Sequence, residues 1–175
     1  MPKISQGQIE KDEEMIVKVL QENAKQSIDK IAKKCGCSRQ KVWRTIKRME
    51  EDKTIWGYPA LINYDKFGLK HYTALVKRNP KPFNKEIVED VMKGHLGDRL
   101  PEGDIKIDNA LFVHGEYDWI ISFTAPNVKM MKKFIDKLLV IFGEYIDSYS
   151  IQETIIPVRK QGIKNPLVKE LVDYL

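Results

Sequence analysis

The chain has 175 residues, a formal net charge of +5 and 31% charged residues. Because 42% of the residues are hydrophobic, the composition supports ordinary globular cores and excludes wholesale disorder. No apolar run reaches the roughly 18 residues that a membrane helix needs, and the N-terminal segment lacks the apolar core of a signal peptide. We therefore expect a cytoplasmic protein, not bound to a membrane, with one large domain or two small ones.

The first 57 residues have the periodicity of three short helices. Apolar residues recur at helical spacing over residues 12–23 and again over residues 28–35, where Ser27 is a plausible N-cap and Gly36 ends the helix. A third helix is predicted from Ser38 to about residue 52. The short connection that contains Gly36 is typical of a helix-turn-helix.

After residue 53 the pattern changes to strands. Residues 54–63 are β-prone and are predicted to form a wing and then a linker. From about residue 68 onward the periodicity predicts the order β-α-β-β-α-β. The predicted strands are at 71–76, 105–114, 119–123 and 149–156, and the predicted helices are at 84–92 and 127–142. Residues 93–103 are expected to form a polar loop, and Pro166 to start a short terminal helix.

The predicted fold class is therefore α+β, with an N-terminal winged helix-turn-helix and a C-terminal ferredoxin-like βαββαβ sandwich. In such a sandwich, two helices cover one face of a four-stranded antiparallel sheet. The predicted divisions are residues 1–57 for the winged helix-turn-helix domain, 58–69 for a linker strand, 70–158 for the ferredoxin-like domain and 159–175 for a C-terminal extension.

The positive charge is concentrated in the first of these divisions. Residues 1–57 hold 13 basic and 9 acidic residues, whereas residues 58–175 hold 17 and 16. Residues 21–48 alone hold 9 basic and 2 acidic residues. This concentration is typical of a surface that binds nucleic acid.

The third helix carries the candidate DNA-binding residues. Its arginines are suited to guanine, its glutamine to adenine, and its lysines to phosphate. A solvated helix face is the plain alternative, but such a face usually mixes charges of both signs, and no acidic residue lies within residues 39–48. We expect these cations to lack acidic partners and to contact double-stranded DNA. The candidates are Ser38, Arg39, Gln40, Lys41, Trp43, Arg44, Lys47 and Arg48.

Cysteine and histidine residues give no metal-binding pattern. Cys35 and Cys37 are too close in sequence for a good disulfide and form an incomplete ligand set. The three histidines, His71, His95 and His114, share no ligand spacing with them or with one another. We expect a reduced protein without a metal or another cofactor.

The first part of the chain resembles the N-terminal domain of Lrp/AsnC (feast/famine) transcription regulators. The resemblance lies in five segments taken in order, which are residues 12–16, 31–34, 37–42, 48–55 and 57–58. Residues 64–69 resemble that family's linker. The predicted β-α-β-β-α-β order resembles its ligand-sensing half, and residues 115–118 resemble its Gly-x-Tyr-Asp turn. The resemblance covers about residues 10–158.

The resemblance implies a sequence-specific DNA-binding transcription regulator that forms a dimer or a higher homo-oligomer through its sensing domains. It also implies an amino-acid effector contacted by Gly115, Tyr117 and Asp118, where a carboxylate would receive an ammonium group. In the alternative interpretation these residues only make a hairpin turn, and a regulator without an effector stays open. The loop at 93–103 and the extension at 159–175 depart from the family's pattern, which leaves the effector and the oligomeric state undecided.

Two other functions compete with this one. Siroheme decarboxylases resemble this two-domain plan, and an enzyme of that kind would use histidine and arginine residues to hold a poly-carboxylate substrate. The available residues are His71, Arg78, His95, Arg99 and His114. The third function is small-molecule binding by a protein whose first domain only forms dimers. Because a decarboxylase has no need of a basic third helix, we favour a DNA-binding regulator that is not an enzyme.

Overall fold

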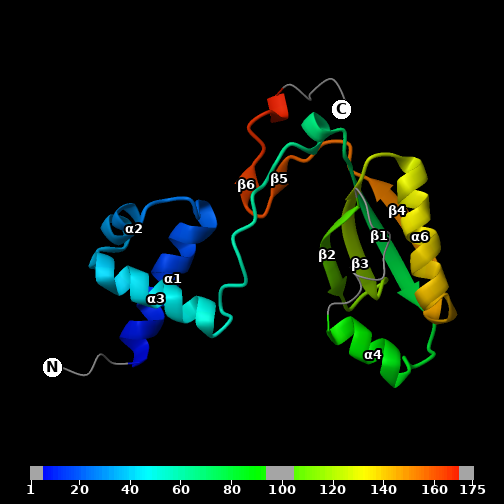
Figure 1. Ribbon diagram of the computed structural model, residues 1–175, viewed down its shortest axis with the longest axis horizontal. Helices are drawn as coiled ribbons and strands as arrows, with labels where there is room; N and C mark the ends of the chain where they lie inside the picture. The colour runs from blue at the N-terminus through cyan, green and yellow to red at the C-terminus, as the bar shows by residue number, and fades with distance from the viewer. Residues whose placement is uncertain (1–5, 94–104, 170–175) are drawn as a thin grey trace. The chain divides into compact units, whose positions relative to one another are not determined.

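Figure 1 shows the computed structural model of the protein, which describes residues 6–93 and 105–169. Contacts divide the chain into two compact units. One contains the N-terminal part up to Leu61 together with the segment that begins at Pro157, and the other contains Ile62–Ile156. The boundaries predicted from the sequence stay predictions.

Three helices form the N-terminal part of the first unit: α1 (Gln6–Glu22), α2 (Ile28–Cys35) and α3 (Arg39–Glu51). Their apolar stripes meet in one core, in which Ile16, Ile31, Val42 and Met49 are almost completely buried. The three predicted helices are thus present. The first begins earlier than predicted, at Gln6, and in its added first turn Gln8 donates a 3.1 Å hydrogen bond to Asp12.

The predicted β-wing at residues 54–63 is wrong, because no strand occurs between α3 and Lys70, a stretch that the structure describes in full. The backbone N–H of Ile55 donates to the carbonyl of Met49 at 2.8 Å, which turns the chain at the end of α3. A β-prone segment becomes a wing only where a second strand pairs with its backbone groups. The chain instead continues to a short 3-10 helix, η1 (Tyr64–Phe67).

The second unit is a four-stranded antiparallel sheet with two helices, α4 (Lys85–Met92) and α6 (Val128–Phe142). The strand order is β2-β3-β1-β4, which is the ferredoxin-like arrangement predicted from the sequence. The strands are β1 (Lys70–Arg78), β2 (Lys106–Phe112), β3 (Trp119–Ala125) and β4 (Ile146–Glu153). The predicted loop at 93–103 falls, from residue 94 on, outside the described residues.

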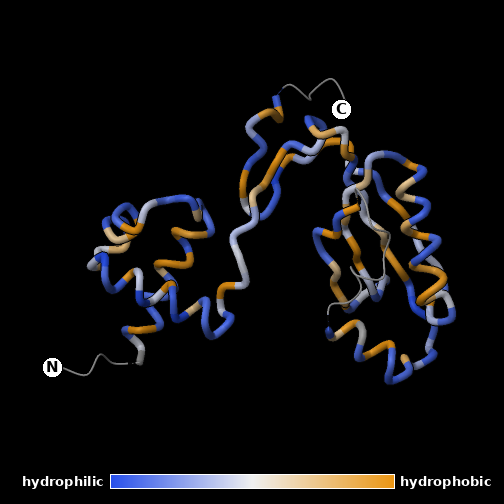
Figure 2. Tube along the Cα trace, viewed as in Figure 1, coloured by the Kyte–Doolittle hydropathy of each residue, from blue (hydrophilic) through white to orange (hydrophobic). Residues whose placement is uncertain are grey.

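Both helices pack on the same face of this sheet. Alternate residues of the two central strands, among them Val76 of β1 and Phe123 of β3, share a buried core with Ile87 of α4 and Phe134 of α6. The rings of Phe123 and Phe134 stack with their centroids 4.2 Å apart. Figure 2 shows hydrophobic residues along the central strands and in α6. The intervening side chains point to the opposite face because strand residues alternate between faces.

The C-terminal segment forms a small hairpin that was not predicted. Strand β5 (Arg159–Lys160) pairs with strand β6 (Ile163–Lys164) in an antiparallel register. The predicted helix after Pro166 falls, from residue 170 on, outside the described residues. Within the described parts of the chain, no helix combines the length and apolarity that crossing a bilayer requires.

Candidate DNA-binding surface

The turn between α2 and α3 is fixed by backbone conformation and capping. Gly36 adopts a φ of 61°, a left-handed conformation that side chains disfavour. The N–H of Cys37 donates to the carbonyl of Ala32 at 3.0 Å and closes the end of α2. The Ser38 hydroxyl then accepts a 3.2 Å hydrogen bond from the N–H of Lys41 and caps α3. The orientation in which α3 leaves α2 is therefore set locally.

Helix α3 has a buried face and an exposed face. Val42, Ile46 and Met49 lie in the core. Trp43 is 53% exposed, although a large aromatic ring is usually buried. The Lys47 ammonium nitrogen lies 5.3 Å from the centre of the Trp43 ring, within the range of a cation–π contact. An aromatic ring and a cation are thus presented together to solvent.

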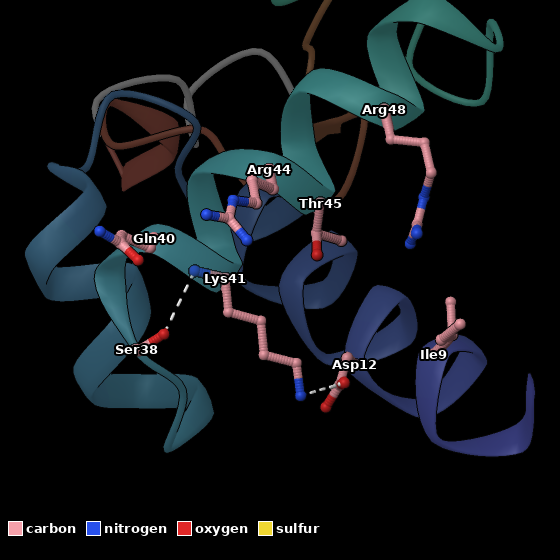
Figure 3. A pocket seen from close by; sticks show the side chains of 8 residues that line it. All are labelled: Ile9, Asp12, Ser38, Gln40, Lys41, Arg44, Thr45 and Arg48. Carbon is pink, nitrogen blue, oxygen red and sulfur yellow. Dashed lines mark hydrogen bonds and ion pairs between the residues drawn. The ribbon is translucent and has the colours of Figure 1, made fainter. Parts of the chain in front are cut away.

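Asp12 of α1 holds the first turn of α3. Its side chain is only 4% exposed and forms an ion pair with the Lys41 ammonium group, which Figure 3 shows reaching from α3 to α1. Gln8 donates a further hydrogen bond to the same carboxylate. The hydrogen bond from Lys41 lowers the pKa of Asp12, and the same bond raises the pKa of Lys41. The structure therefore turns Lys41 toward the protein and gives Asp12 a role that the sequence analysis did not assign.

Other cations of α3 also face carboxylates of the chain, so the expectation that they lack acidic partners is wrong. The pairs are Arg48–Glu13 at 2.7 Å, Arg39–Asp29 at 3.6 Å and Lys47–Glu51 at 3.8 Å. In the last two pairs every side chain is more than half exposed. Exposed pairs of this kind contribute about 0–1 kcal/mol. A phosphate group can therefore replace these carboxylates at a small cost.

A groove of about 330 Å³ lies beside the exposed face of α3. In Figure 3 the side chains of Gln40 and Arg44 stay on the α3 side of this groove and do not reach α1. Neither forms a side-chain hydrogen bond or ion pair with any residue that the structure describes. Both are exposed, so a planar amide and a guanidinium fork are available to an external partner. The groove is lined by Ile9, Asp12, Ser38, Gln40, Lys41, Arg44, Thr45 and Arg48.

The predicted effector residues lie at the turn between β2 and β3. The Asp118 carboxylate accepts a 2.8 Å hydrogen bond from the backbone N–H of Arg78, and the Asp118 N–H donates to the carbonyl of Val76 at 2.9 Å. Asp118 thereby ties the hairpin to the end of β1. A Cβ atom at Gly115 would meet nothing within 4 Å, so the local backbone does not require glycine there. Tyr117 is half-buried.

Two of the residues that a decarboxylase would use, His71 and Arg78, lie near opposite ends of β1. His71 Nδ1 lies 2.7 Å from the Thr154 hydroxyl, near the start of β1. The guanidinium carbon of Arg78, at the other end of that strand, lies 3.6 Å from the centre of the Phe83 ring. At a rise of ~3.3 Å per residue, His71 and Arg78 are about 23 Å apart along the strand.

The structure describes one of the three remaining candidates. His114 is exposed next to the turn, while His95 and Arg99 lie outside the described residues. Across the residues that the structure describes, no three His, Cys, Asp or Glu side chains are grouped so that they could hold a metal ion.

The fold and the exposed helix define a two-domain protein with a helix-turn-helix and a ferredoxin-like domain. Residues 14–50 match the AsnC-type helix-turn-helix domain, a DNA-binding module that includes the turn and nearly all of α3. A comparison with curated proteins finds no match. The chain thus carries a helix-turn-helix of AsnC type.

Solved structures of transcription regulators, two of them AsnC or AsnC family proteins, share the fold over most of the chain. The transcriptional regulator NMB0573 from Neisseria meningitidis, solved in complex with L-Met, has 18% identity and a TM-score of 0.64 over 96% of this chain and 99% of its own. An AsnC family regulator from Agrobacterium tumefaciens has 21% identity and a TM-score of 0.64 over 94% and 97%. E. coli AsnC has 16% identity and a TM-score of 0.54 over 91% and 97%. The predicted resemblance to this family is confirmed.

Replacing Asp12 with Asn tests its role in holding α3. We expect the free energy of unfolding of the helical unit at pH 7 to fall by about 1–3 kcal/mol, because a charged buried hydrogen bond is lost. Since the pKa of Asp12 is lowered by folding, its contribution is complete above the unfolded-state pKa of about 3.9 and disappears as the pH falls further. Denaturant unfolding followed by circular dichroism from neutral to acidic pH measures both effects.

Glu22→Gln is the matched control for Asp12→Asn. It removes a carboxylate of α1 whose side chain is 70% exposed and 3.2 Å from Lys34, so we expect a loss below about 1 kcal/mol. Equal losses in the two variants, or a difference between Asp12→Asn and wild type that persists unchanged at the lowest pH, would contradict the assigned role.

Proposed function

We propose that the protein is a transcription regulator, not an enzyme, that binds specific sites on double-stranded DNA through α3. The observation that carries this proposal is the exposed pair Gln40 and Arg44 on the third helix of an AsnC-type helix-turn-helix. In helix-turn-helix proteins this helix enters the major groove with its N-terminal part against the base edges. Gln40 and Arg44 lie in the first two turns of α3, where base contacts are made.

The other predicted DNA-binding residues are expected to make different contacts, according to their surroundings in the structure. On binding, Arg39 and Lys47 would break their exposed ion pairs within the chain and contact phosphate groups. Arg48 would do the same once its ion pair with Glu13 is broken. Trp43 offers an apolar surface to the sugar or to a thymine methyl group. Ser38 keeps the helix end capped near the backbone of the DNA. Lys41 stays with Asp12 and orients the helix that makes these contacts.

Arg44 variants separate base reading from general attraction to DNA. On sites selected by the wild-type protein from genomic fragments, Arg44→Ala and Gln40→Ala should each weaken binding by about 5- to 150-fold, which corresponds to the 1–3 kcal/mol of a paired contact with a base. Arg44→Lys keeps the charge but not the planar fork. It should retain the salt dependence of binding and lose preference for the selected site over mixed-sequence DNA. Fluorescence anisotropy titrations measure all three variants.

Lys137→Ala is the control for these variants, because Lys137 is an exposed cation of α6 in the other unit. We expect its affinity to match that of the wild type within about twofold, since one exposed charge outside the helix-turn-helix contributes little. If Arg44→Ala binds with wild-type affinity and keeps the wild-type preference for selected sites, the surface that contacts the bases lies elsewhere.

The homo-oligomer is proposed to form through the sheet face that points away from α4 and α6. This face carries Leu75 of β1, Leu111 of β2 and Ile120 of β3, in register across neighbouring strands. Leu111 is 49% exposed, and polar residues such as Ser150 lie opposite Leu75 on β4. A two-fold assembly would present two α3 helices to successive major grooves, about 34 Å apart.

Leu111→Glu tests this interface, because a carboxylate in a buried apolar contact is strongly unfavourable. We expect the mass measured by light scattering to fall to that of one chain. Affinity for a two-half-site duplex should fall by about 10²-fold, because the second α3 no longer binds from the same assembly. Val140→Glu makes the same charge change at an 83% exposed position of α6 and should alter neither quantity. An unchanged mass in Leu111→Glu would exclude this face.

An amino-acid effector is proposed at the β2–β3 turn, with Gly115, Tyr117 and Asp118. Two observations support it: the Asp118 carboxylate is fixed by the N–H of Arg78, and a regulator of the same fold was solved in complex with L-Met. A carboxylate held by a backbone donor keeps lone pairs free for an ammonium group.

L-methionine is the first ligand to test, together with N-acetyl-methionine, which has no ammonium group. At a hundredfold excess over its Kd, a ligand stabilises the protein by about 2.7 kcal/mol, and the melting temperature rises accordingly. We expect this shift with a free amino acid, no shift with its acetylated form, and a smaller shift in Asp118→Asn. Equal responses to both compounds would contradict an ammonium site at Asp118.

A further inference from the structure

The C-terminal hairpin has a well-defined turn. Gln161 and Gly162 adopt φ angles of 44° and 81°, and positive φ at both central residues is the requirement of a type I′ turn, which matches the twist of paired strands. Below the paired residues, the N–H of Asn165 donates to the carbonyl of Val158 at 3.0 Å, and its side-chain amide donates to the carbonyl of Pro157 at 2.8 Å. The chain therefore forms a short two-stranded ribbon here with a defined turn.

This ribbon is basic along its whole length. Residues 154–169 contain four cations, Arg159, Lys160, Lys164 and Lys169, and no acidic residue. Arg159, Lys164 and Lys169 are exposed, and none of them forms an ion pair with a carboxylate of the described chain. Arg159 donates to the carbonyl of Gly162, which shapes the turn and leaves its positive charge without a carboxylate partner in the described parts of the chain.

The distribution of charge over the two units points to the same partner as α3. The unit that contains the helices and the ribbon, residues 1–61 and 157–173, holds 17 basic and 11 acidic residues, a net charge of +6. The unit that spans residues 62–156 holds 13 and 14, a net charge of −1. The excess positive charge of the protein is therefore confined to the unit that carries the helix-turn-helix.

An isolated two-stranded hairpin is marginally stable in water, and this one also leaves Val158 55% and Ile163 41% exposed. A partner that contacts the ribbon would stabilise it. Since Arg159, Lys164 and Lys169 have no carboxylate partner among the described residues, a polyanion fits the ribbon better than a second, equally basic copy of the same ribbon.

We propose that the hairpin at residues 157–165, together with Lys169, is a second DNA-binding element that contacts the phosphate backbone of the duplex. Its lysines and arginine are expected to add affinity and salt dependence without base preference, because phosphate contacts carry no sequence information. The inference rests on the proposed DNA-binding function.

The test uses the full chain and a fluorescein-labelled duplex of mixed sequence. In the triple variant Arg159→Ala, Lys164→Ala, Lys169→Ala, the slope of log affinity against log salt concentration should fall by about 2–3, since each phosphate contact that is removed lowers it by about 0.9. The preference for selected sites over mixed sequence should stay as in the wild type. The matched control is the triple variant Lys129→Ala, Lys132→Ala, Lys133→Ala, which removes the same charge from exposed positions of α6 and should retain the wild-type slope.

The other outcomes of this experiment distinguish failure of the proposed function from failure of the inference about the hairpin. A wild-type protein that binds no duplex at low salt overturns the proposed function, and the inference falls with it. Wild-type binding together with an unchanged slope in the hairpin variant, or an equal decrease in the α6 control, overturns the inference alone. A smaller mass of the hairpin variant in light scattering, with the slope restored at high protein concentration, would assign the ribbon to contacts between copies and also overturn it.

Discussion

Presentation of the polar side chains of α3 depends on how this helix is held on the rest of its unit. Val42, Ile46 and Met49 bury one face of the helix, and the pairing of Lys41 with the buried Asp12 fixes its first turn against α1. An apolar stripe alone is not directional, whereas the hydrogen-bonded ion pair favours one rotation of the helix. Because one side of α3 is held in this way, Gln40 and Arg44 on the other side have a defined direction.

The acidic residues around α3 explain how a basic surface stays ordered without DNA. Asp29 and Glu51 lie near Arg39 and Lys47 at 3.6–3.8 Å, close enough to limit repulsion among the cations and far enough to be replaced. Arg48 is held more firmly by Glu13 at 2.7 Å. The free energy of DNA binding would thus be the attraction of these cations to phosphate minus the smaller free energy of breaking their intramolecular ion pairs. Both quantities are electrostatic, which makes the affinity sensitive to salt.

Periodicity in the sequence predicted the three helices and the strand order of the sheet, because both follow from local spacing of apolar residues. The wing was predicted wrongly, since β-prone residues at 54–63 have no second strand to pair with. Three acidic partners of α3, Asp12, Glu13 and Asp29, were missed because they lie outside the helix in sequence and approach it only after folding. Glu51 lies four residues after Lys47 on the same helix, so that pair was readable from the sequence. The hairpin was missed because strands of two residues are too short to show alternation.

Photo-crosslinking from α3 examines the contact between this helix and DNA. A photoreactive phenylalanine derivative in place of Trp43, which is 53% exposed, should form a covalent adduct with duplex DNA on irradiation, and competition with selected sites should suppress the adduct. The same derivative in place of Val140, on α6 of the other unit, should form none. Absence of an adduct at position 43 under conditions where the protein binds DNA, or equal adducts at both positions, would contradict the account.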